Sequence, residues 1–155
     1  KKLKKNKMFP KHNNIINFFI SLPLLFILNP VFVLIFFLSS FLIDADHYLY
    51  YVFEKKNFSL KKAYRWFVIR DSKWRKLSTQ ERRKHAYSVV IFHGLELIFV
   101  LLLLSKIYYP LFFIALGFFM HLVEDAIEEV PLGTIERKLF FTYSVYVYFT
   151  KTKFK

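Results

Sequence analysis

A run of residues without any charged side chain constrains this chain most strongly, because it extends from Asn13 to Ile43. Two further stretches are almost as apolar: 88–105 contains one charged residue, Glu96, and 107–122 contains none. About 20 apolar residues in a helix that rises 1.5 Å per residue cross the hydrocarbon core of a bilayer. A soluble helical bundle would have to bury stretches such as 97–104, which are apolar on every face. The pattern therefore predicts an all-α integral membrane protein.

The composition combines two properties that rarely occur together. Hydrophobic residues make up 55% of the chain, yet its net charge is +13. Such an excess of apolar residues excludes a disordered basic tail. Because the chain has no Cys, disulfide scaffolds and thiolate metal sites are excluded as well. Only three Gly are present, which leaves no glycine-rich phosphate-binding loop.

The positions of the charges indicate a topology. Six Lys lie within 1–12, twelve Lys and Arg face three acids within 54–84, and the last basic residues are Lys151, Lys153 and Lys155. Asn29-Pro30 divides the first apolar run, since residues before Pro avoid helical geometry. Four transmembrane helices are predicted, near 13–28, 31–53, 80–105 and 108–130. This arrangement leaves only Lys106, among 24 basic residues, on the far side. The positive-inside rule then places both termini in the cytoplasm, with 1–155 as one domain of the cell membrane.

Two segments lie outside the predicted spans. Residues 54–79 form a basic cytoplasmic segment, in which Ser59 caps a helix over 60–70 whose mixture of aromatic and basic residues suits the headgroup layer. Ser78 and Glu81 form a capping box at the start of the third span. Pro131-Leu132-Gly133 ends the fourth span. The C-terminal segment 134–155 is expected at the interface, with 134–150 either lying on the membrane or forming a weak further span.

Ionisable residues inside the predicted spans are the main indication of function, because a charge in the bilayer is costly. Asp44 and His47 are three residues apart and His121 and Asp125 are four apart, so each pair shares a helix face. The remaining residues of this kind are His12, Asp46, His85, His93, Glu96 and Glu124. His85, His93 and Glu96 share a face of the predicted third helix. In the four-span topology all five His lie in the cytoplasmic leaflet. Three helices thus each present a His with a carboxylate, which predicts a metal site in the bundle core.

Imidazole and carboxylate ligands without thiolate suit Zn²⁺ best, with Mn²⁺ or Fe as alternatives. The number of candidate ligands exceeds the needs of one tetrahedral ion and suggests two. Two such ions can hold a phosphate and lower the pKa of bound water. A carboxylate outside the ligand set, Glu96 or Asp46, would be the base or would orient the water. The expected substrate is a phosphate-bearing lipid or amphiphile, whose headgroup would meet basic residues at the membrane face. These are Lys11, Arg82, Arg83 and Lys84.

Two short motifs, Ile43-Asp44-Ala45-Asp46-His47 and His121-Leu122-Val123-Glu124-Asp125, resemble those of the small membrane-bound metal-dependent hydrolases. That family of multi-helix inner-membrane proteins is regarded as similar to zinc-dependent phospholipase C. His93-Gly94-Leu95-Glu96 is similar to a His-x-x-Glu ligand pair of the phospholipase C relatives. The resemblance extends from about His12 to Gly133. It implies metal-site roles for His12, Asp44, His47, His85, His93, Glu96, His121 and Asp125.

The main expectation is a membrane-embedded metal-dependent hydrolase that cleaves a phosphoester at the cytoplasmic leaflet. A metal-ion or proton transporter using the same cluster is an alternative, although beyond Glu96 the third helix offers only Ser105 and Lys106 to the other leaflet. A non-catalytic membrane adaptor is the other alternative, with the basic segment as its docking surface. No nucleic-acid partner is expected, because no binding motif accompanies the basic residues and the topology already accounts for them.

Overall fold

A computed structural model describes residues 11–154 of this chain, with side chains from residue 15 onward. The described part is mostly helical, as the sequence predicted. Its helices are α1 (Lys11–Leu24), α2 (Pro30–Leu42), α3 (Ala45–Lys55), α4 (Leu60–Trp74), α5 (Thr79–Lys84), α6 (Leu95–Leu104), α7 (Pro110–Glu129), the 3₁₀ turn η1 (Val130–Leu132), α8 (Glu136–Leu139) and α9 (Phe141–Thr150). Two short strands, β1 (His85–Ala86) and β2 (Thr152–Lys153), pair in parallel.

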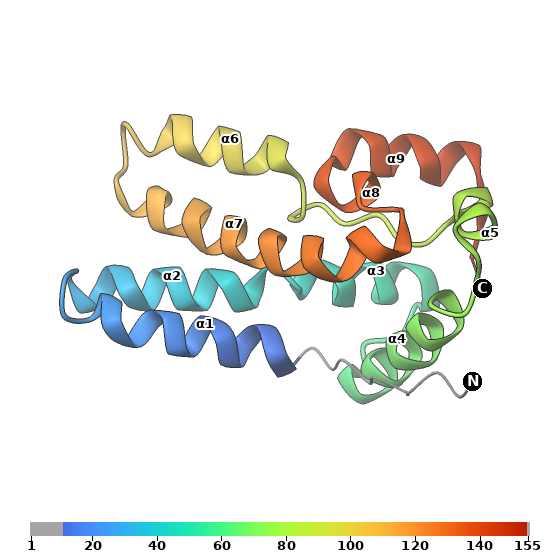
Figure 1. The fold of residues 1–155 in the computed structure, drawn as a ribbon, viewed down its shortest axis with the longest axis horizontal. Coiled ribbons are helices and arrows are strands. Elements are labelled where there is room, and N and C mark those ends of the chain that lie inside the picture. Colours follow the sequence, from blue (N-terminus) through green and yellow to red (C-terminus); the bar gives the residue numbers. More distant parts are fainter. Residues whose placement is uncertain (1–10, 155) are drawn as a thin grey trace.

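Two helical hairpins form the body of the molecule. The pairs α1–α2 and α6–α7 are joined by turns at 25–29 and 105–109, and Figure 1 shows both turns at the same end of the long axis. Helices α2 and α7 pack together between the outer helices α1 and α6. Phe36, Phe113 and Leu122 are buried in this body, whereas large apolar side chains such as Phe19 and Phe99 are exposed on it. An apolar outer surface of this kind suits lipid rather than water.

Helices α2 and α7 approach closely at Gly117. A Cβ at this position would lie 2.5 Å from the Phe36 carbonyl oxygen and 2.2 Å from Ser39 Oγ. Only Gly allows two backbones to pack at such a distance, and small residues serve the same purpose between membrane helices. The contact fixes α2, which leads into Asp44, against α7, which carries His121 and Asp125.

Two helices in the described part are long and apolar enough to cross a membrane: 30–55, in which α3 follows α2 after Ile43-Asp44, and 110–132. The apolar helices α1 and α6 contain 14 and 10 residues. At 1.5 Å per residue they reach only about 21 and 15 Å, short of a core of about 30 Å. Four complete spans are therefore not confirmed, and the two hairpins each pair a long helix with a short one.

The predicted third helix, 80–105, is wrong as a continuous element. Helix α5 ends at Lys84, residues 85–94 form strand β1 and an irregular loop, and α6 begins only at Leu95. Gly94 precedes α6 with extended backbone geometry. A Cβ at Gly94 would lie 2.6 Å from Glu96 Oε2 and 2.8 Å from Phe141 Cβ. His85, His93 and Glu96 consequently do not share a helix face.

Buried side chains explain why the loop forms instead of a helix. Arg70 donates to the Tyr87 carbonyl, Arg137 donates to the His85 carbonyl, and Ser144 Oγ donates to the Ser88 carbonyl. These bonds satisfy carbonyl groups that a helix would have paired internally. The sequence around 85–94 gives no local sign of them, because their donors lie in α4, α8 and α9.

Helices α4, α5, α8 and α9 and the two strands lie at the end of the molecule opposite the turns (Figure 1). The predicted caps are confirmed here: Ser59 accepts a hydrogen bond from Lys62 N at the start of α4, and Ser78 and Glu81 form a capping box on α5. The basic segment 55–84 and Lys151 and Lys153 are at this end, whereas Lys106 lies in the turn at the other. Among the described residues, these basic clusters thus lie at one end of the fold.

Candidate metal centre

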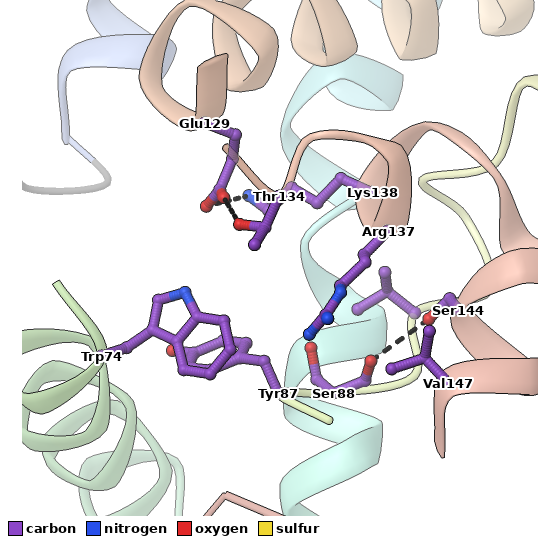
Figure 2. Close-up of a pocket in the computed structure, with 10 residues that line it drawn as sticks. Trp74, Tyr87, Ser88, Glu129, Thr134, Arg137, Lys138, Ser144 and Val147 are labelled. Carbon is purple, nitrogen blue, oxygen red and sulfur yellow. Dashed lines mark hydrogen bonds and ion pairs between the residues drawn. The ribbon is translucent and has the colours of Figure 1, made fainter. Parts of the chain in front are cut away.

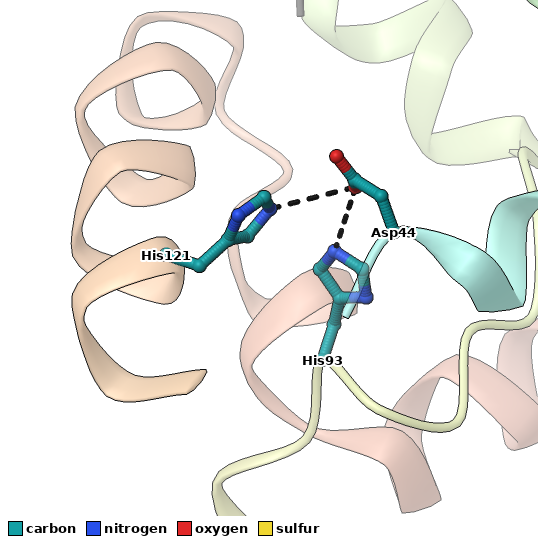
Figure 3. Close-up of side chains that lie close together, drawn as sticks. All are labelled: Asp44, His93 and His121. Atoms are coloured by element: carbon teal, nitrogen blue, oxygen red, sulfur yellow. Dashed lines mark ion pairs between the residues drawn. The ribbon is translucent and has the colours of Figure 1, made fainter. Parts of the chain in front are cut away.

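Five titratable side chains converge where α2, α3, α7 and the loop 85–94 meet. Asp44 lies between α2 and α3, His47 in α3, His93 at the end of the loop, and His121 and Asp125 one turn apart in α7. Figure 3 shows the rings of His93 and His121 directed from different elements at one oxygen of Asp44. The sequence predicted each of these five residues as a metal ligand, and the fold brings them together.

The distances within this cluster match those between ligands of a metal ion. Asp44 Oδ1 lies 3.6 Å from His93 Nε2, 3.5 Å from His121 Nε2 and 3.7 Å from His47 Nε2. Asp125 Oδ2 lies 3.4 Å from His93 Nε2 and 3.7 Å from His121 Nε2. Atoms bound about 2.0–2.2 Å from a tetrahedral ion are roughly 3.3–3.6 Å apart. All five separations are longer than an ordinary hydrogen bond, and a group with this spacing could hold a metal ion.

Burial adds a second argument for a cation. His93 and His121 are 0% and 1% exposed, and among the described residues their Nε2 atoms have no hydrogen-bond partner. A buried polar atom without a partner costs about 1–3 kcal/mol. Both nitrogens are directed at the same two carboxylates, Asp44 and Asp125. The buried His and Asp residues could therefore hold a metal ion.

The opposite ring nitrogens of these two His are fixed by hydrogen bonds. His93 Nδ1 lies 3.1 Å from Asp46 Oδ2, and His121 Nδ1 lies 2.9 Å from the Ser40 carbonyl oxygen. The last carbonyl groups of a helix have no partner within it, and the end of α2 at Leu42 leaves the Ser40 carbonyl available. Carboxylates and carbonyls that accept from Nδ1 orient metal-binding His in this way.

Asp46 contacts the cluster through the ring of His93, on the side away from Asp44. Its Oδ2 accepts hydrogen bonds from Phe92 N at 2.9 Å and from the His93 ring. Asp46, His47 and His93 form a second group whose ligand atoms lie within 4.8 Å of one another, and it shares His93 with the group Asp44, His93 and His121. A second ion there would compete with the Asp46–His93 hydrogen bond. Each group could hold a metal ion, and the number of ions stays a prediction.

Lys138 is a residue of the site that sequence reasoning missed. Its Nζ lies 3.0 Å from Asp125 Oδ2 and 4.0 Å from Glu129 Oε1. Burial lowers the pKa of Lys138, but the carboxylates of Asp125 and Glu129 outweigh this effect and raise the pKa above its ordinary value. Lys138 is therefore charged and offsets part of the negative charge of the cluster. No periodicity or spacing in the sequence connects α8 with α7 in this way.

Lys138 also lines a small cavity (Figure 2). The cavity has a volume of about 30 Å³, enough for one or two water molecules. Glu129, Arg137 and Ser144 contribute polar groups to its wall.

Within the cluster itself, His93 and His121 are enclosed, whereas the side chain of Asp44 is 42% exposed. Asp44 is thus the most exposed member of the cluster.

Other predicted site residues have different positions. Glu96 accepts hydrogen bonds from Phe141 N and Thr142 N, at 3.0 and 3.1 Å, and so caps α9. His85 Nδ1 lies 2.7 Å from Thr152 Oγ1 beside the strand pair. Neither residue is part of the cluster. Glu124 belongs to another contact, in which its Oε2 accepts a hydrogen bond from Asn17 Nδ2 between α1 and α7.

The four residues predicted to meet a lipid headgroup are not all exposed together at one surface. Arg82 is buried and donates to the carbonyl groups of Leu77 and Leu132, which ties α5 to η1. Arg83 and Lys84 are exposed. The side chains of Lys11 and His12 lie outside the described residues.

No family model, curated protein or solved structure matches this chain.

Proposed function

We propose that this protein is a membrane-embedded metal-dependent hydrolase that cleaves a phosphoester of a lipid or amphiphile. One observation carries the proposal: two buried ring nitrogens without partners and two carboxylates converge at separations of 3.4–3.7 Å. The donor set of imidazole and carboxylate favours Zn²⁺, as it did in the sequence. The resemblance of the motifs around Asp44 and His121 to membrane-bound metal-dependent hydrolases supports the same activity.

Asp44, His93, His121 and Asp125 would hold the ion, with His47 at the edge of the set. When bound, a divalent metal supplies a Lewis acid that polarises a phosphoryl oxygen and lowers the pKa of water. Asp46 and the Ser40 carbonyl keep the His rings in their tautomer and orientation. Lys138 holds Asp125 through its Oδ2 and limits the net negative charge that an anionic substrate would meet.

The chain's own groups also suggest the acceptor of a proton. The second oxygen of Asp44 points away from the two rings (Figure 3), and this side chain is the exposed member of the cluster. That oxygen can therefore take a proton from a water molecule beside the scissile phosphorus. The sequence predicted Glu96 and Asp46 for this role. Both oxygens of Glu96 accept hydrogen bonds at the start of α9, and Asp46 is buried behind His93.

Membrane insertion with both termini in the cytoplasm is part of the proposal. The apolar outer surface of the hairpins and the two helices of sufficient length support insertion. The basic residues at the end opposite the turns support the orientation. In this orientation the metal cluster lies toward the cytoplasmic side, because Asp44 and His93 adjoin the elements of that end.

The test is metal content and hydrolysis with the full chain purified in detergent. After chelation and dialysis against Zn²⁺, we expect about one ion per chain in the wild type and a large loss in His121→Ala. His85→Ala is the matched control and should retain the ion, since His85 lies outside the cluster. Metal-loaded protein should hydrolyse bis(p-nitrophenyl) phosphate or phosphatidylglycerol vesicles, and His121→Ala should not. Equal metal content in all three proteins would contradict the metal site. Bound metal without hydrolysis, but with metal uptake by proteoliposomes, would instead favour the transporter.

A further inference from the structure

A basic groove lies between the end of α3 and helix α4, apart from the metal cluster. Its volume is about 370 Å³. The lining residues are Tyr51, Lys55, Asn57, Lys62, Arg65, Trp66 and Ile69. Lys62, Arg65, Trp66 and Ile69 are spaced three, one and three residues apart, which places them on one face of α4. No residue of the metal cluster lines the groove, so a ligand here would be bound independently.

The lining of the groove is suited to an anion with an apolar part. Three cations, Lys55, Lys62 and Arg65, line it without any acidic residue. Among the described residues, none of the three forms an ion pair with a carboxylate. The ring of Trp66 lies 5.4 Å from Lys55 Nζ and 5.6 Å from the ring of Tyr51. Cations that lack partners beside aromatic rings provide both charge and an apolar surface to one ligand.

The residues around the basic groove favour a lipid over other anionic ligands. Phe53, Phe58 and Leu60, in the segment that borders the groove, are all largely exposed. Exposed aromatic rings can also stack on nucleic-acid bases, but the aliphatic side chain of Leu60 has no ring for this purpose. At the boundary between headgroups and acyl chains, by contrast, such side chains enter the apolar layer while the cations remain at the phosphates.

We propose that the basic groove binds the phosphodiester headgroup of an anionic phospholipid. Lys62 and Arg65 contact the phosphate, Lys55 adds charge from α3, and the ring of Trp66 packs against the glycerol and the first methylene groups. The bound lipid fixes α4 in the headgroup layer. This site is separate from the metal centre and does not depend on the hydrolase activity.

Tryptophan fluorescence provides a direct test, because the chain has two Trp and Trp74 is 3% exposed. The full chain, as wild type and as Trp74→Phe, is reconstituted in phosphatidylcholine nanodiscs that contain brominated phosphatidylglycerol or brominated phosphatidylcholine at equal fraction. We expect the anionic brominated lipid to quench Trp66 more strongly. The wild type serves as a second reporter if Trp74→Phe does not fold, since a buried Trp74 is little quenched.

The double variant Lys62→Ala/Arg65→Ala should lower the apparent affinity for the anionic lipid about 10-fold or more. Its matched control, Lys61→Ala/Lys73→Ala, removes the same charge from α4 outside the groove and should lower it far less. Equal quenching by both lipids, or equal losses in both double variants, would overturn the proposal. So would displacement of the lipid by millimolar inorganic phosphate or by a short RNA. Both double variants should keep the metal content of the wild type, which separates this test from that of the hydrolase.

Discussion

Asp46 and His93 form the contact that orients the candidate metal centre: Asp46 Oδ2 lies 3.1 Å from His93 Nδ1, while Nε2 of the same ring is directed at Asp44 and Asp125. The two residues are far apart in sequence and belong to different elements, α3 and the loop 85–94. Because Asp46 Oδ2 also accepts from Phe92 N, it fixes both the ring and the backbone that carries it. Asp46 would therefore affect a bound ion through His93 rather than as a ligand itself.

Removal of this support should weaken metal binding without abolishing it. Outer contacts of metal-binding His are commonly worth 10- to 100-fold in affinity, and we expect a loss in this range for Asp46→Ala. Asp46→Asn keeps an oxygen acceptor and should lose less than Asp46→Ala. Competition with a fluorescent Zn²⁺ chelator measures both affinities. Wild-type affinity in Asp46→Ala would show that the ring is held by other contacts.

Lys138 should make the metal-free protein more stable than it would otherwise be. Without this cation, the carboxylates of Asp44, Asp125 and Glu129 face one another with less compensation, and a bound divalent ion relieves their repulsion. In Lys138→Met we expect a lower melting temperature for the chelated protein and a larger increase on addition of Zn²⁺ than in the wild type. Lys73→Met, an exposed Lys on α4, is the control. If Zn²⁺ raised the melting temperature of Lys138→Met by the same amount as that of the wild type, Lys138 would have no effect on the charge of the cluster.

Replacement of Glu96 tests whether this residue caps a helix or binds a metal ion. Its carboxylate accepts from Phe141 N, Thr142 N and Thr142 Oγ1 at the start of α9. Loss of a helix cap typically costs about 0.5–2 kcal/mol, so Glu96→Ala should unfold more easily in a denaturant titration. Its metal content should equal that of the wild type. Loss of metal with unchanged stability would restore the role of ligand that the sequence predicted.

The two groups of predicted ligands show which parts of the site a sequence reveals. Asp44 and His47, and His121 and Asp125, are paired by local helical spacing, and both pairs are in the cluster. His85 and Glu96 were grouped with His93 by assuming a continuous helix over 80–105. Side chains distant in sequence, such as Arg70, Arg137 and Ser144, take up the carbonyl groups there, and no local pattern predicts such contacts. Lys138 was missed for the same reason, because its partners Asp125 and Glu129 lie in α7, on the other side of η1, and no helical spacing connects them with α8.

The close approach of α2 and α7 should be sensitive to one methyl group. In Gly117→Ala the new Cβ would meet the Phe36 carbonyl oxygen, a backbone atom that cannot rotate away as Ser39 Oγ can. Overpacking of this kind costs about 1–3 kcal/mol, and we expect a lower melting temperature. Separation of the helices also moves His121 away from Asp44 and Ser40, so Zn²⁺ affinity should decrease. Phe119→Ala, on an exposed part of α7, is the control for affinity.

The orientation can be tested with single cysteines, since the chain has no native Cys. Lys61→Cys places a thiol on the exposed side of α4, and Lys106→Cys places one in the turn between α6 and α7. If the basic end faces the cytoplasm, a membrane-impermeant maleimide added to intact cells should label position 106 and leave position 61 unlabelled until the membrane is opened. Lys61 is preferable to Ser59 as a probe, because Ser59 caps α4 and its replacement would disturb the helix. Labelling of both positions in intact cells, or of position 61 alone, would contradict the orientation. Equal labelling of both positions only after the membrane is opened would contradict insertion across the bilayer.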